Sequence, residues 1–133
     1  MKRFFQAYLC LLAGGLILAF PSVLQAATGT WIGGSGAQNW NVNGNWGGAA
    51  FPNATTDVAT LGSVITAPTT ITLGQNITIS SLTVNEDTAA NTYILTGSQL
   101  TLNAATSLTQ SGAGALQIDS AVVLAANTIF TVT

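Results

Sequence analysis

From Ala27 to its end, the sequence has no lysine, arginine, histidine or cysteine, since both cations and the single thiol lie within the first ten residues. A chain without cations has nothing to hold the phosphates of a nucleic acid or to dock on an anionic lipid surface. Two of the three ligand types of zinc sites are missing, and no disulfide can form. These absences exclude nucleic acid as a partner, and the sequence predicts no cofactor and no metal.

Few side chains are left for catalysis. They are the phenol of Tyr93 and four acids: Asp57, Glu86, Asp87 and Asp119. General acids, bases and nucleophiles need a pKa tuned by burial or by charged neighbours. Most of that apparatus is absent, so the sequence indicates a non-enzymatic protein.

Residues 1–26 have the pattern of a signal peptide. Lys2-Arg3 precede the apolar stretch 4–20, Pro21 interrupts it, and a small residue precedes the expected cleavage before Ala27. An uncleaved transmembrane anchor is the alternative, but the run is short for a span of about 20 residues. We therefore expect export, to the extracellular space or to the cell surface in association with the outer membrane.

Apolar residues alternate with polar ones from about Thr66 onward, which indicates strands rather than helices. The alternation slips by one residue at Ser80-Ser81. A slip sends side chains to the other face of a strand, so we interpret this pair as a corner that keeps the apolar residues inward.

A repeat accompanies the alternation. Residues 74–79 (GQNITI) recur as 97–102 (GSQLTL) and, more loosely, as 114–118 (GALQI), at intervals near 20 residues. Such periods are typical of a β-solenoid, and an antiparallel β-sandwich is the alternative. We expect an all-β parallel β-helix over 63–133, with stacked aliphatic rows that include Ile71, Leu73, Ile77, Ile79, Leu100, Leu102, Leu116 and Ile118.

The segment 27–62 is rich in Trp, Gly and Asn and is expected to form an N-terminal cap. Its tryptophans would cover the end of the first coil, Gly33, Gly34 and Gly36 would permit close approach, and Asp57 would bond backbone N–H groups. The alternative is a carbohydrate-binding module in which exposed rings stack on sugars. Its candidate ligand-binding residues are Trp31, Trp40, Trp46, Asn39 and Asn45.

The stretch Trp31 to Trp46 (WIGGSGAQNWNVNGNW), followed by Phe51-Pro52 and Asp57 to Leu61 (DVATL), resembles the start of bacterial proteins with autotransporter-associated β-strand repeats. The stretches 79–84 (ISSLTV) and 93–97 (YILTG) are similar to that family's repeat unit. The resemblance implies an exported, passenger-like right-handed parallel β-helix with a structural or adhesin-like role. Its partner would be a glycan or a host or matrix surface, and membrane association would come only through a C-terminal region missing from this chain.

Three other patterns have plainer explanations. Glu86-Asp87 are expected in a solvated turn, since no calcium-binding repeat surrounds them. Hydrolysis of a glycoside would require the carboxylates of Glu86 and Asp119 to lie at a short, defined separation. Threonines suited to an ice-binding face include the T-x-T pairs Thr70/Thr72 and Thr131/Thr133, but these threonines follow no regular coil period. Outward threonine is ordinary in strands.

The sequence stops within an apparent strand, Phe130 to Thr133, with no polar cap. Solenoids need capped ends. We therefore expect a truncated C-terminus, and the alternative is end-to-end self-association. The ligand, the secretion route and the oligomeric state are left open.

Overall fold

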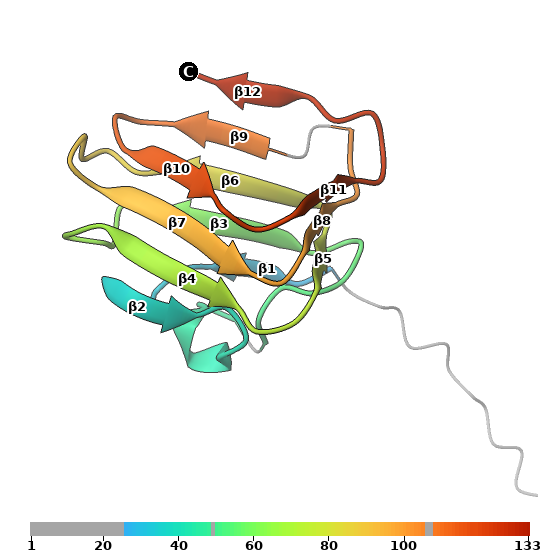
Figure 1. The fold of residues 1–133 in the computed structure, drawn as a ribbon, viewed down its shortest axis with the longest axis horizontal. Coiled ribbons are helices and arrows are strands. Elements are labelled where there is room, and N and C mark those ends of the chain that lie inside the picture. The colour runs from blue at the N-terminus through green and yellow to red at the C-terminus, as the bar shows by residue number, and fades with distance from the viewer. Residues whose placement is uncertain (1–25, 49, 106–107) are drawn as a thin grey trace, which may run out of the picture.

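The computed structural model describes residues 26–48, 50–105 and 108–133, so the expected signal peptide lies outside the described residues. Strands stacked in three parallel sheets make up almost all of the regular structure (Figure 1). The long sheet contains β1 (Thr28–Thr30), β3 (Val58–Gly62), β6 (Ser81–Asn85), β9 (Leu108–Ser111) and β12 (Phe130–Val132). The middle sheet contains β2 (Gly36–Asn39), β4 (Thr69–Leu73), β7 (Thr92–Gly97) and β10 (Ala115–Ile118). The short sheet contains β5 (Ile77–Ile79), β8 (Leu100–Leu102) and β11 (Val122–Leu124).

The chain visits the long, middle and short sheets in turn and then begins the next winding. All pairs between the named strands are parallel. Three windings are complete, β3–β5, β6–β8 and β9–β11, so the protein is a parallel β-solenoid of about three turns. The expected fold class is confirmed, and the antiparallel sandwich is wrong.

The core lies between the three sheets, because alternate residues of each strand point inward. In β4 and β6, for example, Ile71, Leu73, Leu82 and Val84 are buried, while the residues between them, Thr72 and Thr83, are half-buried. Fully burying one such aliphatic side chain stabilises a fold by about 1.5–3 kcal/mol. All eight expected row residues contribute: six are buried, and Leu116 and Ile118 pack against the cluster as partly buried side chains.

The corner expected at Ser80-Ser81 is confirmed, since β5 ends at Ile79, β6 begins at Ser81, and both Ile79 and Leu82 are buried. The third copy of the repeat, however, was wrongly placed. Residues 115–118 form β10, which pairs with β7 in the middle sheet. The true partner of β8 is β11, where Val122 pairs with Leu100 and Leu124 with Leu102.

The segment 27–62 supplies strands to the same stacks, since β1 pairs with β3 and β2 with β4. The short 3-10 helix η1 (Asn43–Asn45) and the loop after it lie beside β1 and β2 (Figure 1). The boundary between cap and repeats at residues 62 and 63 stays a prediction. No helix in the described part of the chain is long and apolar enough to cross a membrane.

Candidate functional site

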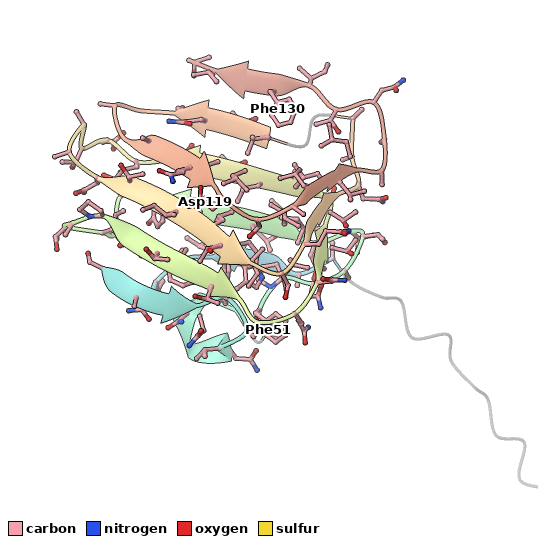
Figure 2. All side chains as sticks on the ribbon, in the orientation of Figure 1. Phe51, Asp119 and Phe130 are labelled. Atoms are coloured by element: carbon pink, nitrogen blue, oxygen red, sulfur yellow. The ribbon has the colours of Figure 1, made fainter. Side chains whose placement is uncertain are left out.

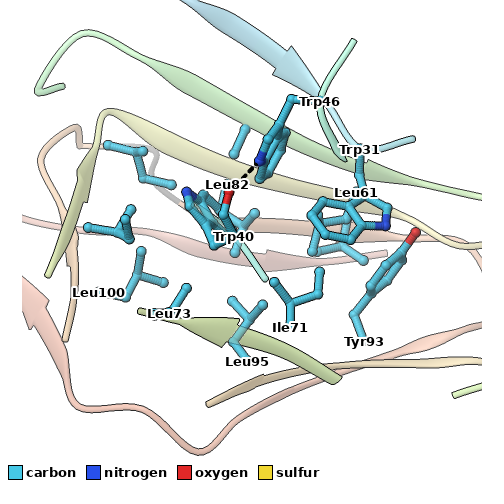
Figure 3. Packing of buried hydrophobic residues seen from close by; sticks show 14 of the residues in the cluster. Trp31, Trp40, Trp46, Leu61, Ile71, Leu73, Leu82, Tyr93, Leu95 and Leu100 are labelled. Atoms are coloured by element: carbon cyan, nitrogen blue, oxygen red, sulfur yellow. Dashed lines mark hydrogen bonds between the residues drawn. The ribbon is translucent and has the colours of Figure 1, made fainter. Parts of the chain in front are cut away.

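The three tryptophans form one buried aromatic cluster at the N-terminal end of the solenoid (Figure 3). Trp46 lies between the other two rings. Its centroid is 5.1 Å from that of Trp31 and 4.5 Å from that of Trp40, with the planes inclined by 84° and 62°. Edge-to-face contacts of this kind contribute about 0.5–1.5 kcal/mol beyond the area they bury.

Each indole N–H of the cluster has an acceptor in the backbone. Trp46 Nε1 donates to the carbonyl of Trp40 at 2.8 Å (Figure 3), and Trp40 Nε1 donates to the carbonyl of Pro52 at 2.9 Å. The contact of Trp31 Nε1 with the Gly34 carbonyl is longer, at 3.4 Å. The close approach expected of Gly33 is confirmed, because an added Cβ there would lie 2.6 Å from the Trp31 ring. Gly34 and Gly36 have positive φ values of 70° and 89°, a region that disfavours larger residues.

Burial of the cluster counts against sugar stacking. The exposed fractions of Trp31, Trp40 and Trp46 are 0%, 0% and 2%. A ring that stacks on a pyranose must offer one open face, and none of these three does. Asn39 is exposed and Asn45 is half-buried, but the Asn45 Nδ2 already donates to the Asn39 carbonyl at 2.8 Å.

Asp57 is a structural acid. Its Oδ1 accepts from the backbone N–H of Ala27 at 2.8 Å, and its Oδ2 accepts from that of Asn53 at 2.9 Å. The expectation that this carboxylate bonds backbone N–H groups is confirmed. The two bonds tie the start of β1 and the loop before β3 to this carboxylate, which gives Asp57 a structural role.

The expectation of a solvated Glu86-Asp87 turn is wrong for Glu86. Asp87 is exposed, but Glu86 is 0% exposed beneath Gly114 of the next winding. Its Oε1 accepts from the Thr88 N–H at 2.9 Å and from Asn91 Nδ2 at 3.2 Å. Its Oε2 is buried without a partner among the described residues.

Tyr93 lies at the same corner. Its hydroxyl donates to the carbonyl of Gly62 at 2.6 Å, and its ring is buried. Burial, and to a lesser extent the nearby Glu86 carboxylate, hold the pKa of Tyr93 above its ordinary value. A phenol that resists ionisation at neutral pH is a hydrogen-bond donor here, and it joins one winding to the next.

The pair of acids required by the hydrolase hypothesis is not assembled. Glu86 precedes β7 and Asp119 (Figure 2) follows β10. Since β7 and β10 are adjacent parallel strands, the two acids lie at opposite ends of the middle sheet. Asp119 is exposed and accepts from Gln117 Nε2 at 2.9 and 3.0 Å. Among the described residues no group of three His, Cys, Asp or Glu side chains could hold a metal ion, and no pocket opens.

One feature of the surface has little signal in the sequence. The register of the long sheet aligns one threonine from each of its five strands. The intervals between these threonines vary with loop length, so no regular repeat points to them.

The comparisons with known proteins add no relative to this picture. No family model, no curated protein and no solved structure matches the chain.

Proposed function

We propose that this protein is an exported, non-enzymatic solenoid that serves as a structural or adhesin-like surface region. The observation that carries the proposal is the environment of the four acids. Asp57 accepts hydrogen bonds from two backbone N–H groups, and Glu86 is buried under the following winding. Asp87 and Asp119 are exposed at separate corners. Nothing in this arrangement positions an acid opposite a base, whereas the stacked strands enclose one continuous core.

The finer proposal is that the chain is the passenger-like region of an autotransporter-type protein. The Trp/Gly opening and the β-strand repeats of the sequence support it, and parallel windings of this length suit a region that projects from a cell surface. A solenoid grows by one strand spacing, about 4.8 Å, with each winding. Added windings therefore extend reach at constant width.

Export from the cytoplasm tests the proposal directly. The full chain is expressed in a Gram-negative host from its own start codon, and the N-terminus of the product is sequenced. We expect cleavage before Ala27 and recovery of the product outside the cytoplasm, in the periplasmic fraction or the medium. An uncleaved product retained in the cytoplasm would overturn the proposal.

The adhesin-like part is tested by measuring the attachment of the purified protein to surfaces coated with glycans or matrix proteins. We expect attachment that survives Asp87→Asn and Asp119→Asn, because neither acid is given a chemical role. Attachment that depends on either acid, together with cleavage of the coating, would indicate an enzyme instead.

A further inference from the structure

A row of threonines crosses the long sheet from its first strand to its last. Register pairs link one threonine per strand without interruption. The members are Thr30, Thr60, Thr83, Thr109 and Thr131. Their sequence neighbours Leu61, Leu82 and Val84 are buried, so the row lies on the outer face of the sheet.

The hydroxyls of this row are free. None of the five makes a hydrogen bond to any residue in the described part of the chain. Other threonine hydroxyls are engaged: that of Thr69 donates to the Ala67 carbonyl, and that of Thr101 accepts from Gln99 Nε2. The row therefore offers donors and acceptors that only an external partner can use.

The surroundings of the row are small and uncharged. The outward positions beside it on β3, β6 and β9 hold Val58, Gly62, Ser81, Asn85 and Ser111. Ser111 Oγ donates to Asn85 Oδ1 at 2.6 Å, which fixes one flank. The described outward positions of the long sheet hold no charged side chain, which would keep a mobile hydration shell. They also hold no aromatic ring on which a sugar could stack.

We propose that this threonine face, the outer surface of the long sheet along the row, binds ice. Parallel strands place successive threonines about 4.8 Å apart, close to the repeat of water oxygens along rows in the ice lattice. Each threonine supplies a hydroxyl that can replace a lattice water and a methyl group that fits between waters. Its χ1 is restricted by β-branching, so little side-chain entropy is lost on binding.

The partner is thus a crystalline, uncharged array of hydrogen-bonding oxygens, and the proposal does not depend on how the protein is exported or what it adheres to. The other two sheets lack such a row. In the middle sheet, the register that contains Thr70 runs through Ala37, Ile94 and Gln117. In the short sheet, the register that aligns Thr78 with Thr101 places Val123 in the next strand.

Growth of ice crystals in a frozen sucrose solution tests the proposal. The purified protein should slow the coarsening of ice grains and shape single crystals into facets. Thr83→Lys places a long charged side chain at the centre of the row. We expect it to raise the concentration needed for half-maximal slowing by about tenfold or more, as disruption at the centre of a contact does.

Thr72→Lys is the matched control, because Thr72 is also a half-exposed threonine in a strand that is paired on both sides. It should retain the wild-type effect, and Thr60→Lys, next to Thr83 in the row, should reproduce the loss. Circular dichroism confirms that each variant is folded. A wild-type protein that slows ice growth no more than an unrelated globular protein would overturn the proposal, as would equal losses in Thr72→Lys and Thr83→Lys.

Discussion

Side-chain oxygens secure many of the backbone N–H groups at the corners of this solenoid, in a region of chain that has no cation. Asn41 Oδ1 accepts from Gly74 N–H at 2.8 Å, and Asn53 Oδ1 accepts from Thr78 N–H at 2.9 Å. Asp57 accepts two further backbone N–H groups. Each such bond contributes about 0.5–1.5 kcal/mol, and more is lost when a buried donor is left without an acceptor. The asparagine-rich composition therefore has a structural explanation.

Gly114 is a residue on which the packing of two windings depends. A Cβ at this position would lie 2.2 Å from Glu86 Cγ and 2.7 Å from Glu86 Cβ. Because Glu86 is buried, it has little room to move, and we expect Gly114→Ala to lower the free energy of unfolding by about 1–3 kcal/mol. Urea denaturation followed by circular dichroism measures the change.

The control for that substitution is Gly62→Ala, since a Cβ at Gly62 meets no atom within 4 Å. Its effect should stay within about 1 kcal/mol, and a stabilising sign is expected from the restricted unfolded chain. Equal destabilisation by both variants would contradict the assigned contact with Glu86.

Tyr93 makes stability sensitive to alkaline pH. Its folded-state pKa is raised above the ordinary value of 10.0, so its contribution is complete below pH 10. Above that pH the unfolded chain releases the phenolic proton while the folded chain keeps it. The free energy of unfolding should then fall by about 1.4 kcal/mol per pH unit.

Urea midpoints recorded across the alkaline range test this dependence. Residues 26–133 contain no lysine, cysteine or second tyrosine that would add a similar slope. Tyr93→Phe should be less stable at neutral pH by about 1 kcal/mol, for the lost bond to the Gly62 carbonyl. Its stability should be nearly flat where the wild type declines, and parallel declines would refute the assignment.

At the scale of strands, period-two alternation was enough to predict the sheets and the Ser80-Ser81 corner, because inward residues in a solenoid must be apolar on every face. Alternation does not say which face a strand occupies. For that reason residues 114–118 were matched to the short sheet although they belong to the middle one. The sequence predicted a solvated Glu86, but Gly114 of the next winding covers this side chain. Local sequence does not encode a contact between windings.

The aromatic cluster packs within the first winding, whose strands β1 and β2 have only three and four residues. Trp46 contacts both other indoles, and Trp46→Ala should cost about 3–5 kcal/mol. Ile32→Ala, at a side chain that is 56% exposed in the same segment, should cost less than about 1 kcal/mol. Denaturation monitored by tryptophan fluorescence measures the free energy of unfolding of both variants. A comparable loss in both would contradict a stabilising role of the aromatic cluster.

Turns between windings should accept insertions that strands do not. One alanine inserted between Ala89 and Ala90, in the exposed turn before β7, lengthens a loop at a cost below about 1 kcal/mol. The same insertion between Ile94 and Leu95 reverses the faces of the rest of β7 and expels buried Leu95, at a cost of about 3 kcal/mol or more. Thermal melts of the two insertions should therefore differ widely; similar melting temperatures would contradict the register of β7.

Across the whole molecule, the two ends of the described solenoid differ. At the N-terminal end, η1 and the residues that follow it cover the edge of β1: Gly47 N–H donates to the Thr30 carbonyl at 2.7 Å, and Ile32 N–H donates to the Asn45 carbonyl at 2.8 Å. At the other end, the last strand of each sheet is paired on one side only within the described residues. Apolar side chains are exposed there, among them Val122, Val123, Leu124, Ile129, Phe130 and Val132.

A polypeptide of these residues should associate through that open end. Free parallel edges pair readily with other strands unless charge or proline protects them, and residues 108–133 contain one acid, no lysine and no proline. Strand β12 presents two exposed apolar side chains at this edge, Phe130 (Figure 2) at 52% exposure and Val132 at 78%. We expect the apparent mass in sedimentation velocity to rise with concentration, and Phe130→Lys with Val132→Lys to suppress the rise. The matched control is Ile32→Lys with Val42→Lys, at exposed apolar positions of the N-terminal end, and it should leave association unchanged. A wild-type chain that stays monomeric at high concentration would show that the open edge is protected in another way.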